Sequence, residues 1–172
     1  LQSFSVNRDG HTFKGVDLNK NLMYQIPTAS IGGHGLAGCA IGGAQLCLDL
    51  LLEWIEKRST STSNMKMSDI PTIHNRLGEI ASRIDAARLI LRNDCIEVER
   101  QMHENGQIST NNKLKYKRNA AYAVKITLES VSIMQQVCGA NGIYNGSPIT
   151  SALMDVQACL LYTSPSPRDR NV

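Results

Sequence analysis

A chain of 172 residues with a formal net charge of +3 is long enough for one hydrophobic core, and this charge alone does not indicate nucleic-acid binding. Apolar residues make up 42% of the chain and aromatic residues only 5%, which favours leucine- and alanine-rich helix packing over a β-sandwich. The five cysteines include no C-x-x-C pair, and we expect no metal site. Three of them lie at or near helix stripe positions, so we expect buried free thiols in a reducing, cytoplasmic compartment, with disulfides as the alternative.

Residues 1–22 predict the end of a β-domain followed by a connector. The turn sequence Asn7-Arg8-Asp9-Gly10 separates Phe4 and Val6 from Phe13 and Val16, and its Asp-Gly pair is typical of a hairpin. A hairpin alone is only marginally stable. We therefore expect residues 1–16 to be the remnant of a middle β-domain that starts before this chain, and residues 17–22 to be a polar connector.

A first helix is predicted from Thr28 or Gly35 to Arg58. Its apolar residues cover nearly the whole circumference, which indicates a central, buried helix. Ile31 to Leu48 contains no charged residue, so a membrane span is an alternative. This stretch holds six glycines and no second candidate span accompanies it, so we favour a buried helix and expect no membrane segment.

A polar segment rich in serine and threonine, Lys57 to Ser68, follows this helix. Composition alone is typical of a flexible loop. The hydroxyl groups and the cations Lys57 and Arg58 gather next to a helix end, however, so an anion cradle is the functional alternative.

The longest helix is predicted over Asp69 to Gly106. Asp69 and Pro71 stand where an N-cap and a first-turn proline belong, and Asn105-Gly106 supplies the stop. Apolar residues recur every three or four positions for about eight turns and form one stripe. The members of this stripe are Ile73, Leu77, Ile80, Ile84, Ala87, Leu91, Cys95, Val98 and Met102. The opposite, solvated face carries Arg76, Glu79, Arg83, Arg92 and Glu99.

A third helix is predicted from Thr110 to Val137, with a basic run in its first turns that we interpret as a solvated face. Gly139-Ala140-Asn141-Gly142 ends this helix, and a fourth helix starts near Thr150. The fourth helix is hardly begun at Ala158. Together these segments predict an all-α, up-and-down four-helix bundle over residues 23–158, with a truncated fourth helix.

The last residues, 159–172, are unlike the rest of the chain. Cys159 to Asp169 resembles the translation of a common transposase sequencing adapter. We therefore expect Ala158 to be the last native residue and 159–172 to be a non-native tail, with a native Pro/Ser linker as the alternative.

Three segments resemble the C-terminal domain of the acyl-CoA dehydrogenase superfamily. Leu77 to Leu89 is similar to the second bundle helix of that family, and Gln136 to Ile143 is similar to its glutamine-plus-glycine turn. Asp155 to Ala158 is similar to the start of the next helix, although Met154-Asp155 replaces the usual Arg-Asp pair.

Two further features resemble the flavin-dependent monooxygenase branch, which includes the oxygenase components of p-hydroxyphenylacetate hydroxylase and dibenzothiophene monooxygenase. Asn21-Leu22-Met23-Tyr24-Gln25-Ile26-Pro27 is similar to the Asn-Pro-Leu-Tyr-Arg-Ile/Leu-Pro segment that leads into the bundle, with Gln25 in place of arginine. The dehydrogenase signature Arg-x-x-Phe-Gly is absent after the first helix, where Arg58-Ser59-Thr60-Ser61-Thr62 stands.

This resemblance implies an oxygenase that takes reduced FMN or FAD from a separate flavin reductase and hydroxylates a small aromatic or heterocyclic substrate with O2. It implies a homotetramer with flavin at the subunit contacts. It places Arg58 at the flavin phosphate, and Gln136, Gly139 and Gly142 at the flavin tail of a neighbouring subunit. A plain helix C-cap is the alternative for the two glycines.

The catalytic histidine of the family lies beyond Asp155, so the resemblance implies no catalytic residue in this chain. His34, His74 and His103 are expected to be ordinary helix or loop residues. Two other classes of protein stay open: a true acyl-CoA dehydrogenase, which uses FAD to desaturate an acyl-CoA, and a non-catalytic helical interaction module.

Overall fold

The computed structural model describes residue 19 and residues 21–60, 64–142, 144 and 146–163, and these residues form four α-helices with three short 3-10 segments. In chain order they are η1 (Leu22–Gln25), α2 (Thr28–Glu56), η2 (Met67–Asp69), α3 (Pro71–Asn105), α4 (Thr110–Cys138), η3 (Gly139–Gly142) and α5 (Pro148–Thr163). Their only β-structure is an isolated bridge between Ser59 and Lys66, so the all-α prediction is confirmed for the described part. The hairpin predicted over residues 1–16 lies outside the described residues.

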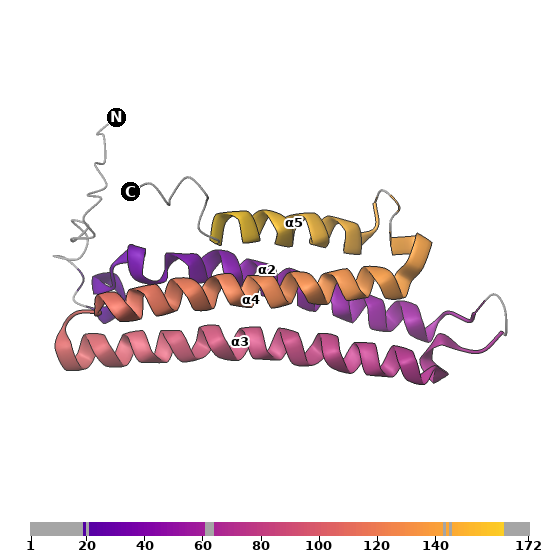
Figure 1. Cartoon of the computed structure of the whole chain (residues 1–172), viewed down its shortest axis with the longest axis horizontal. Helices are drawn as coiled ribbons and strands as arrows, with labels where there is room; N and C mark the ends of the chain where they lie inside the picture. Colours follow the sequence, from indigo (N-terminus) through magenta and orange to yellow (C-terminus); the bar gives the residue numbers. More distant parts are fainter. Residues whose placement is uncertain (1–18, 20, 61–63, 143, 145, 164–172) are drawn as a thin grey trace, which may run out of the picture.

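The four helices lie side by side along one long axis and run alternately up and down, as predicted (Figure 1). α2 and α4 are the central pair, because each packs against the other and against both α3 and α5. Their facing sides form the main core, in which Ala37, Ala44, Leu51, Ala123 and Val124 are completely buried.

The predicted apolar stripe of α3 is confirmed at most of its positions. Ile80, Ile84, Ala87, Leu91, Val98 and Met102 are buried. The prediction was wrong at Cys95, which is exposed, because the helix turns Asp94 inward at this level instead. Both residues lie three or four positions from Leu91 and from Val98, so spacing alone is compatible with either one.

The two ends of α3 were predicted with different success. Gly106 adopts the left-handed conformation with φ +64° and its N–H donates to the carbonyl of Met102, as expected for a glycine stop. Pro71 occupies the first turn, but the N-cap prediction was wrong: Ile70 is the N-cap and Asp69 lies in η2. A fixed proline φ at the first helical position starts the helix without a side-chain cap.

α2 satisfies the length and composition test for a membrane span over Ser30–Glu56, with a mean hydropathy of 1.6. The structure offers another reason for this composition. α2 contacts three other helices, so its inward residues need to be apolar on several sides. This packing favours the reading of α2 as a core helix.

The described cysteines are all free thiols. Cys47 and Cys138 are buried, and burial raises the pKa of both thiols. Cys39 and Cys95 are exposed, so the expectation of buried thiols was wrong for these two. Cys159 is half-buried on α5, which continues to Thr163 and therefore passes the predicted boundary at Ala158.

Candidate functional site

Arg58 lies at the surface on a fixed aromatic platform. It follows the C-cap residue Lys57 directly, and its backbone N–H donates to the carbonyl of Ile55 over 3.3 Å. Its guanidinium carbon lies 5.2 Å from the ring centroid of Trp54, a cation–π distance. Trp54 is half-buried and packs against the main core, so the platform under Arg58 belongs to the rigid part of the bundle.

The Ser/Thr-rich segment continues from Arg58 as a short antiparallel hairpin. The N–H of Met67 donates to the carbonyl of Arg58 over 2.9 Å, and the N–H of Thr60 donates to the carbonyl of Met65 over 2.8 Å. The β-bridge between Ser59 and Lys66 lies between these two bonds. The flanks of the segment therefore have a defined backbone, and the tip, residues 61–63, lies outside the described residues.

Three cations gather on this short stretch. Lys57, Arg58 and Lys66 are exposed, and none of them forms an ion pair with an acidic side chain among the described residues. A planar guanidinium supplies several N–H donors in one plane, which suits the oxygens of a phosphate group. The chemistry of this set thus fits an anionic group such as phosphate.

The glycine turn after α4 is held together by its own hydrogen bonds. The N–H of Gly139, whose φ is +57°, donates to the carbonyl of Gln136 and ends α4. The carbonyl of Gly142 accepts hydrogen bonds from the side chains of Gln135 and Thr150. A Cβ atom at position 142 would lie 2.9 Å from the carbonyl oxygen of Gln135, so only glycine fits there.

These contacts bear on the three predicted flavin-tail residues. Gly139 is the C-cap of α4, as in the C-cap alternative, whereas Gly142 lies at the end of η3 and is required there by the close carbonyl of Gln135. Gln136 is exposed and makes no side-chain hydrogen bond with another described residue, so its amide is free to contact a ligand. Gln135, which was not among the predicted residues, is the glutamine that supports the turn.

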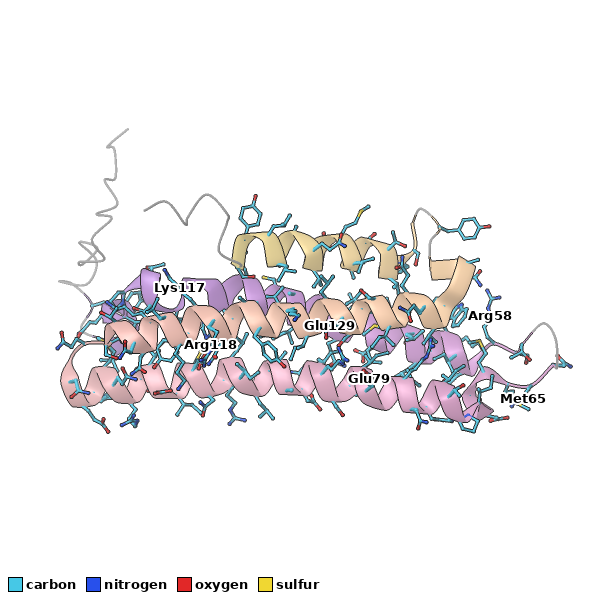
Figure 2. All side chains as sticks on the ribbon, viewed as in Figure 1. Arg58, Met65, Glu79, Lys117, Arg118 and Glu129 are labelled. Atoms are coloured by element: carbon cyan, nitrogen blue, oxygen red, sulfur yellow. The ribbon has the colours of Figure 1, made fainter. Side chains whose placement is uncertain are left out.

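Figure 2 shows Arg58 and Met65 at the end of the bundle where α2 finishes and α4 turns into η3. The structure thus places Arg58, Gln136, Gly139 and Gly142 at one end of the molecule. Lys117 and Arg118 lie in the other half, away from this end (Figure 2). We call the set Lys57, Arg58, Lys66 and Gln136, with the platform Trp54, the basic end.

A buried polar cluster at the opposite end of the bundle was not predicted. Nε2 of His34 on α2 lies 3.0 Å from Oδ2 of Asp94 on α3, and Asp94 is completely buried. The second carboxylate oxygen of Asp94 accepts a hydrogen bond of 2.8 Å from Nδ2 of Asn119 on α4. This cluster joins three helices through the carboxylate of Asp94. Unlike the buried His34, His74 and His103 are exposed.

Tyr116 packs against this cluster, with its ring centroid 6.4 Å from that of His34 in an edge-to-face arrangement. Its hydroxyl oxygen accepts a hydrogen bond from Nε2 of Gln101. Burial, and then the nearby carboxylates of Glu97 and Asp94, raise the pKa of Tyr116 to about 12. The one sequence signal for this cluster was His34 itself, a lone basic side chain inside an uncharged helical stretch.

No group of three or more histidine, cysteine, aspartate or glutamate side chains among the described residues is arranged to hold a metal ion. The two ends therefore differ in kind: the basic end is exposed and cationic, and the His34 cluster is closed. Of these two sites, the basic end is the one that presents its polar groups to solution.

The sequence of this four-helix bundle assigns it to a known protein family. The chain belongs to the family of acyl-CoA dehydrogenase C-terminal domains, whose sequence profile matches residues 34–167. The FADH(2)-dependent resorcinol hydroxylase, oxygenase component, from Rhizobium sp. (strain MTP-10005) is similar to this chain, with 24% identity over 157 residues. That alignment covers 87% of this chain and 38% of the hydroxylase.

Solved structures show the same fold. The 3-HSA hydroxylase from Rhodococcus sp. RHA1 matches with a TM-score of 0.74 and 23% identity, over 84% of this chain and 38% of that one. The HsaA monooxygenase from M. tuberculosis matches with a TM-score of 0.75 and 21% identity, over 90% and 39%. Butyryl-CoA dehydrogenase from Megasphaera elsdenii matches with a TM-score of 0.64 and 19% identity, over 89% and 37%. The chain therefore spans under two fifths of the length of these proteins.

Proposed function

We propose that this chain is the helical-bundle part of the oxygenase component of a two-component flavin-dependent monooxygenase. The observation that carries the proposal is the alignment of 87% of the chain with the oxygenase component of a resorcinol hydroxylase. In this proposal a separate reductase supplies reduced FMN or FAD, and the substrate is a small aromatic or heterocyclic compound. The protein is proposed to be cytoplasmic.

The basic end supports a role in holding the flavin. Bound reduced flavin would supply the electrons with which O2 is activated. The contribution of this chain is to bind and orient: Arg58 donates charge-assisted hydrogen bonds to a flavin phosphate, and Trp54 fixes the plane of the guanidinium. Gln136 at the same end offers an amide to the flavin tail of a neighbouring subunit.

A homotetramer is part of this proposal, and the outer faces of the bundle support it. Leu89 and Ile96 on α3 are 61% and 56% exposed, and Tyr122 on α4 is 52% exposed. Large apolar side chains of this exposure are suited to a contact with another protein surface.

An acyl-CoA dehydrogenase is the second candidate, because butyryl-CoA dehydrogenase shares the fold. The lack of Arg-x-x-Phe-Gly after α2 favours the monooxygenase. In the protein that carries this chain, oxygen consumption with reduced flavin and an aromatic substrate would support the monooxygenase. Bleaching of bound FAD by an acyl-CoA would support the dehydrogenase, and a protein that binds no flavin would support the interaction module.

Arg58→Ala tests the proposed phosphate contact. We expect it to weaken reduced-flavin binding by about 1.5–3 kcal/mol, the range for a lost hydrogen bond to a charged group, with little effect on substrate affinity. Trp54 is the only tryptophan of these 172 residues and lies against Arg58. If any tryptophans elsewhere in the full-length protein are replaced, the fluorescence of Trp54 reports binding at Arg58 directly. Arg92→Ala, an exposed arginine on α3, is the matched control, and equal losses in both variants would contradict the assignment.

A further inference from the structure

In the described part of the bundle, Ser30 is the residue with a buried side-chain oxygen that makes no hydrogen bond. It is 1% exposed, and its Oγ has no hydrogen-bond partner among the residues that the structure describes. Other buried hydroxyls satisfy themselves locally: Thr127 donates to the carbonyl of Ala123, and Ser130 donates to the carbonyl of Ile126. A buried hydroxyl without a partner is costly and therefore points to a missing partner.

His34 stands one helical turn after Ser30, so the two side chains share one face of α2. Asp94 has Asn119 and His34 as donors to its two oxygens, and an ionised carboxylate only accepts hydrogen bonds. His34 therefore donates from Nε2, and in the neutral ring Nδ1 is an acceptor. No direct hydrogen bond joins Nδ1 to Ser30.

We propose that one buried water molecule binds between Ser30 and His34. The water donates to Nδ1 of His34 and accepts from Oγ of Ser30, which supplies the partner that the hydroxyl lacks. Internal waters in proteins occupy such polar sites and bridge groups that have no other partner.

The water would determine which ring nitrogen of His34 carries the proton. By donating to Nδ1, the water would favour the neutral tautomer of His34 that carries its proton on Nε2, the nitrogen that faces Asp94. The acidic and basic groups around Asp94 come from α3 and α4: Glu97 pairs with Lys115, and Arg118 donates to Asn119. The Ser30 water is thus the α2 end of a hydrogen-bond chain that fixes α2 against its two neighbours.

A crystal structure at a resolution that shows ordered water tests the site directly. We expect density for one water within hydrogen-bond distance of both Oγ of Ser30 and Nδ1 of His34. A dry site, or a protein group bonded to Ser30 Oγ, would overturn the proposal.

Nitrogen NMR of the imidazole rings tests it in solution. We expect the His34 spectrum to show the Nε2–H tautomer, and Ser30→Ala to shift the Nδ1 resonance, since the bound water is lost. Ser30→Thr keeps a hydroxyl and should preserve the resonance, and Ser130→Ala, which removes another buried hydroxyl of the bundle, is the matched control. An Nδ1 resonance that is unchanged in Ser30→Ala would refute the bridging water.

Discussion

Asp94 is a carboxylate that the fold removes completely from solvent. Its charge is tolerated because His34 and Asn119 each donate a hydrogen bond to it. A buried charge that loses a partner is strongly destabilising, whereas replacement of both partners by apolar residues is often close to neutral. The cluster therefore contributes more to the correct alignment of α2, α3 and α4 than to net stability.

This asymmetry gives a prediction at the level of single residues. His34→Leu should lower the free energy of unfolding by about 3–5 kcal/mol, because it leaves Asp94 buried with one donor. The double variant His34→Leu/Asp94→Leu should recover most of that loss, as measured by urea denaturation. If the double variant were less stable than His34→Leu, the buried charge would not be the cause.

Tyr116 gives a prediction on pH. Its pKa is raised to about 12, above the value of about 10 for unfolded tyrosine, so the folded state holds the proton more tightly. The resulting stabilisation is complete below pH 10 and is lost as the pH rises to about 12. We expect the free energy of unfolding to fall over this window, and to fall less in Tyr116→Phe. An equal decline in the two proteins would assign the effect to other groups.

Burial could not be predicted from the sequence for single residues at which the charge and the helical spacing gave opposite indications. The helical spacing predicted that Cys95 lies in the core, whereas nothing in the local sequence indicated burial of Asp94, because carboxylates are rarely buried. The burial of Asp94 depends on His34, 60 positions earlier in the chain, and on Asn119, 25 positions later. Such distant partners are invisible to a local pattern.

The helices and most of their ends were predicted because their signals are local: periodicity, glycine stops and a first-turn proline, whereas the N-cap of α3 was not. The basic end was predicted in part. Arg58 and its hydroxyl-rich neighbours were recognised from composition, but its platform Trp54 was not, because stacking depends on the turn that returns Arg58 over the helix. The glycine turn was located correctly, and its hydrogen bonds to Gln135 and Thr150 were missed.

Two glycines in different elements should respond in opposite ways to alanine. Gly142→Ala should destabilise the protein, because the new Cβ would meet the carbonyl oxygen of Gln135 at 2.9 Å. Gly78 lies inside α3, and a Cβ atom added there would meet no other atom within 4 Å. Gly78→Ala should therefore stabilise the protein by about 0.5–1 kcal/mol through helix propensity. Thermal melts of both variants measure this, and a stabilising Gly142→Ala would show that the turn relaxes freely.

At the scale of the whole molecule, the C-terminal boundary is testable by truncation. α5 extends five residues beyond Ala158, and Cys159 and Leu160 are half-buried against the core. We expect a chain of residues 1–163 to keep its melting temperature, and a chain of residues 1–158 to lose a few degrees because it lacks these contacts. An unchanged melting temperature for 1–158 would place the end of the folded domain at Ala158.

The up-and-down order of the whole bundle followed from element lengths and short connections, and the structure confirms it. The central position of α2 followed from its apolar circumference. The exposure of apolar residues such as Leu89 could not be predicted from the sequence pattern, because it depends on which side of α3 the other helices cover.

The six glycines in the first half of α2 have a consequence for the order of folding. Relative to alanine they weaken the intrinsic helix by about 5 kcal/mol in total, so this half of α2 is not expected to be helical before it packs. α3 and α4 are adjacent in the chain, are joined by a short turn and carry far fewer glycines, so they can pair early at a small entropic cost. The most central helix of the bundle would thus be the last to become ordered, closing onto a scaffold that its neighbours have already built.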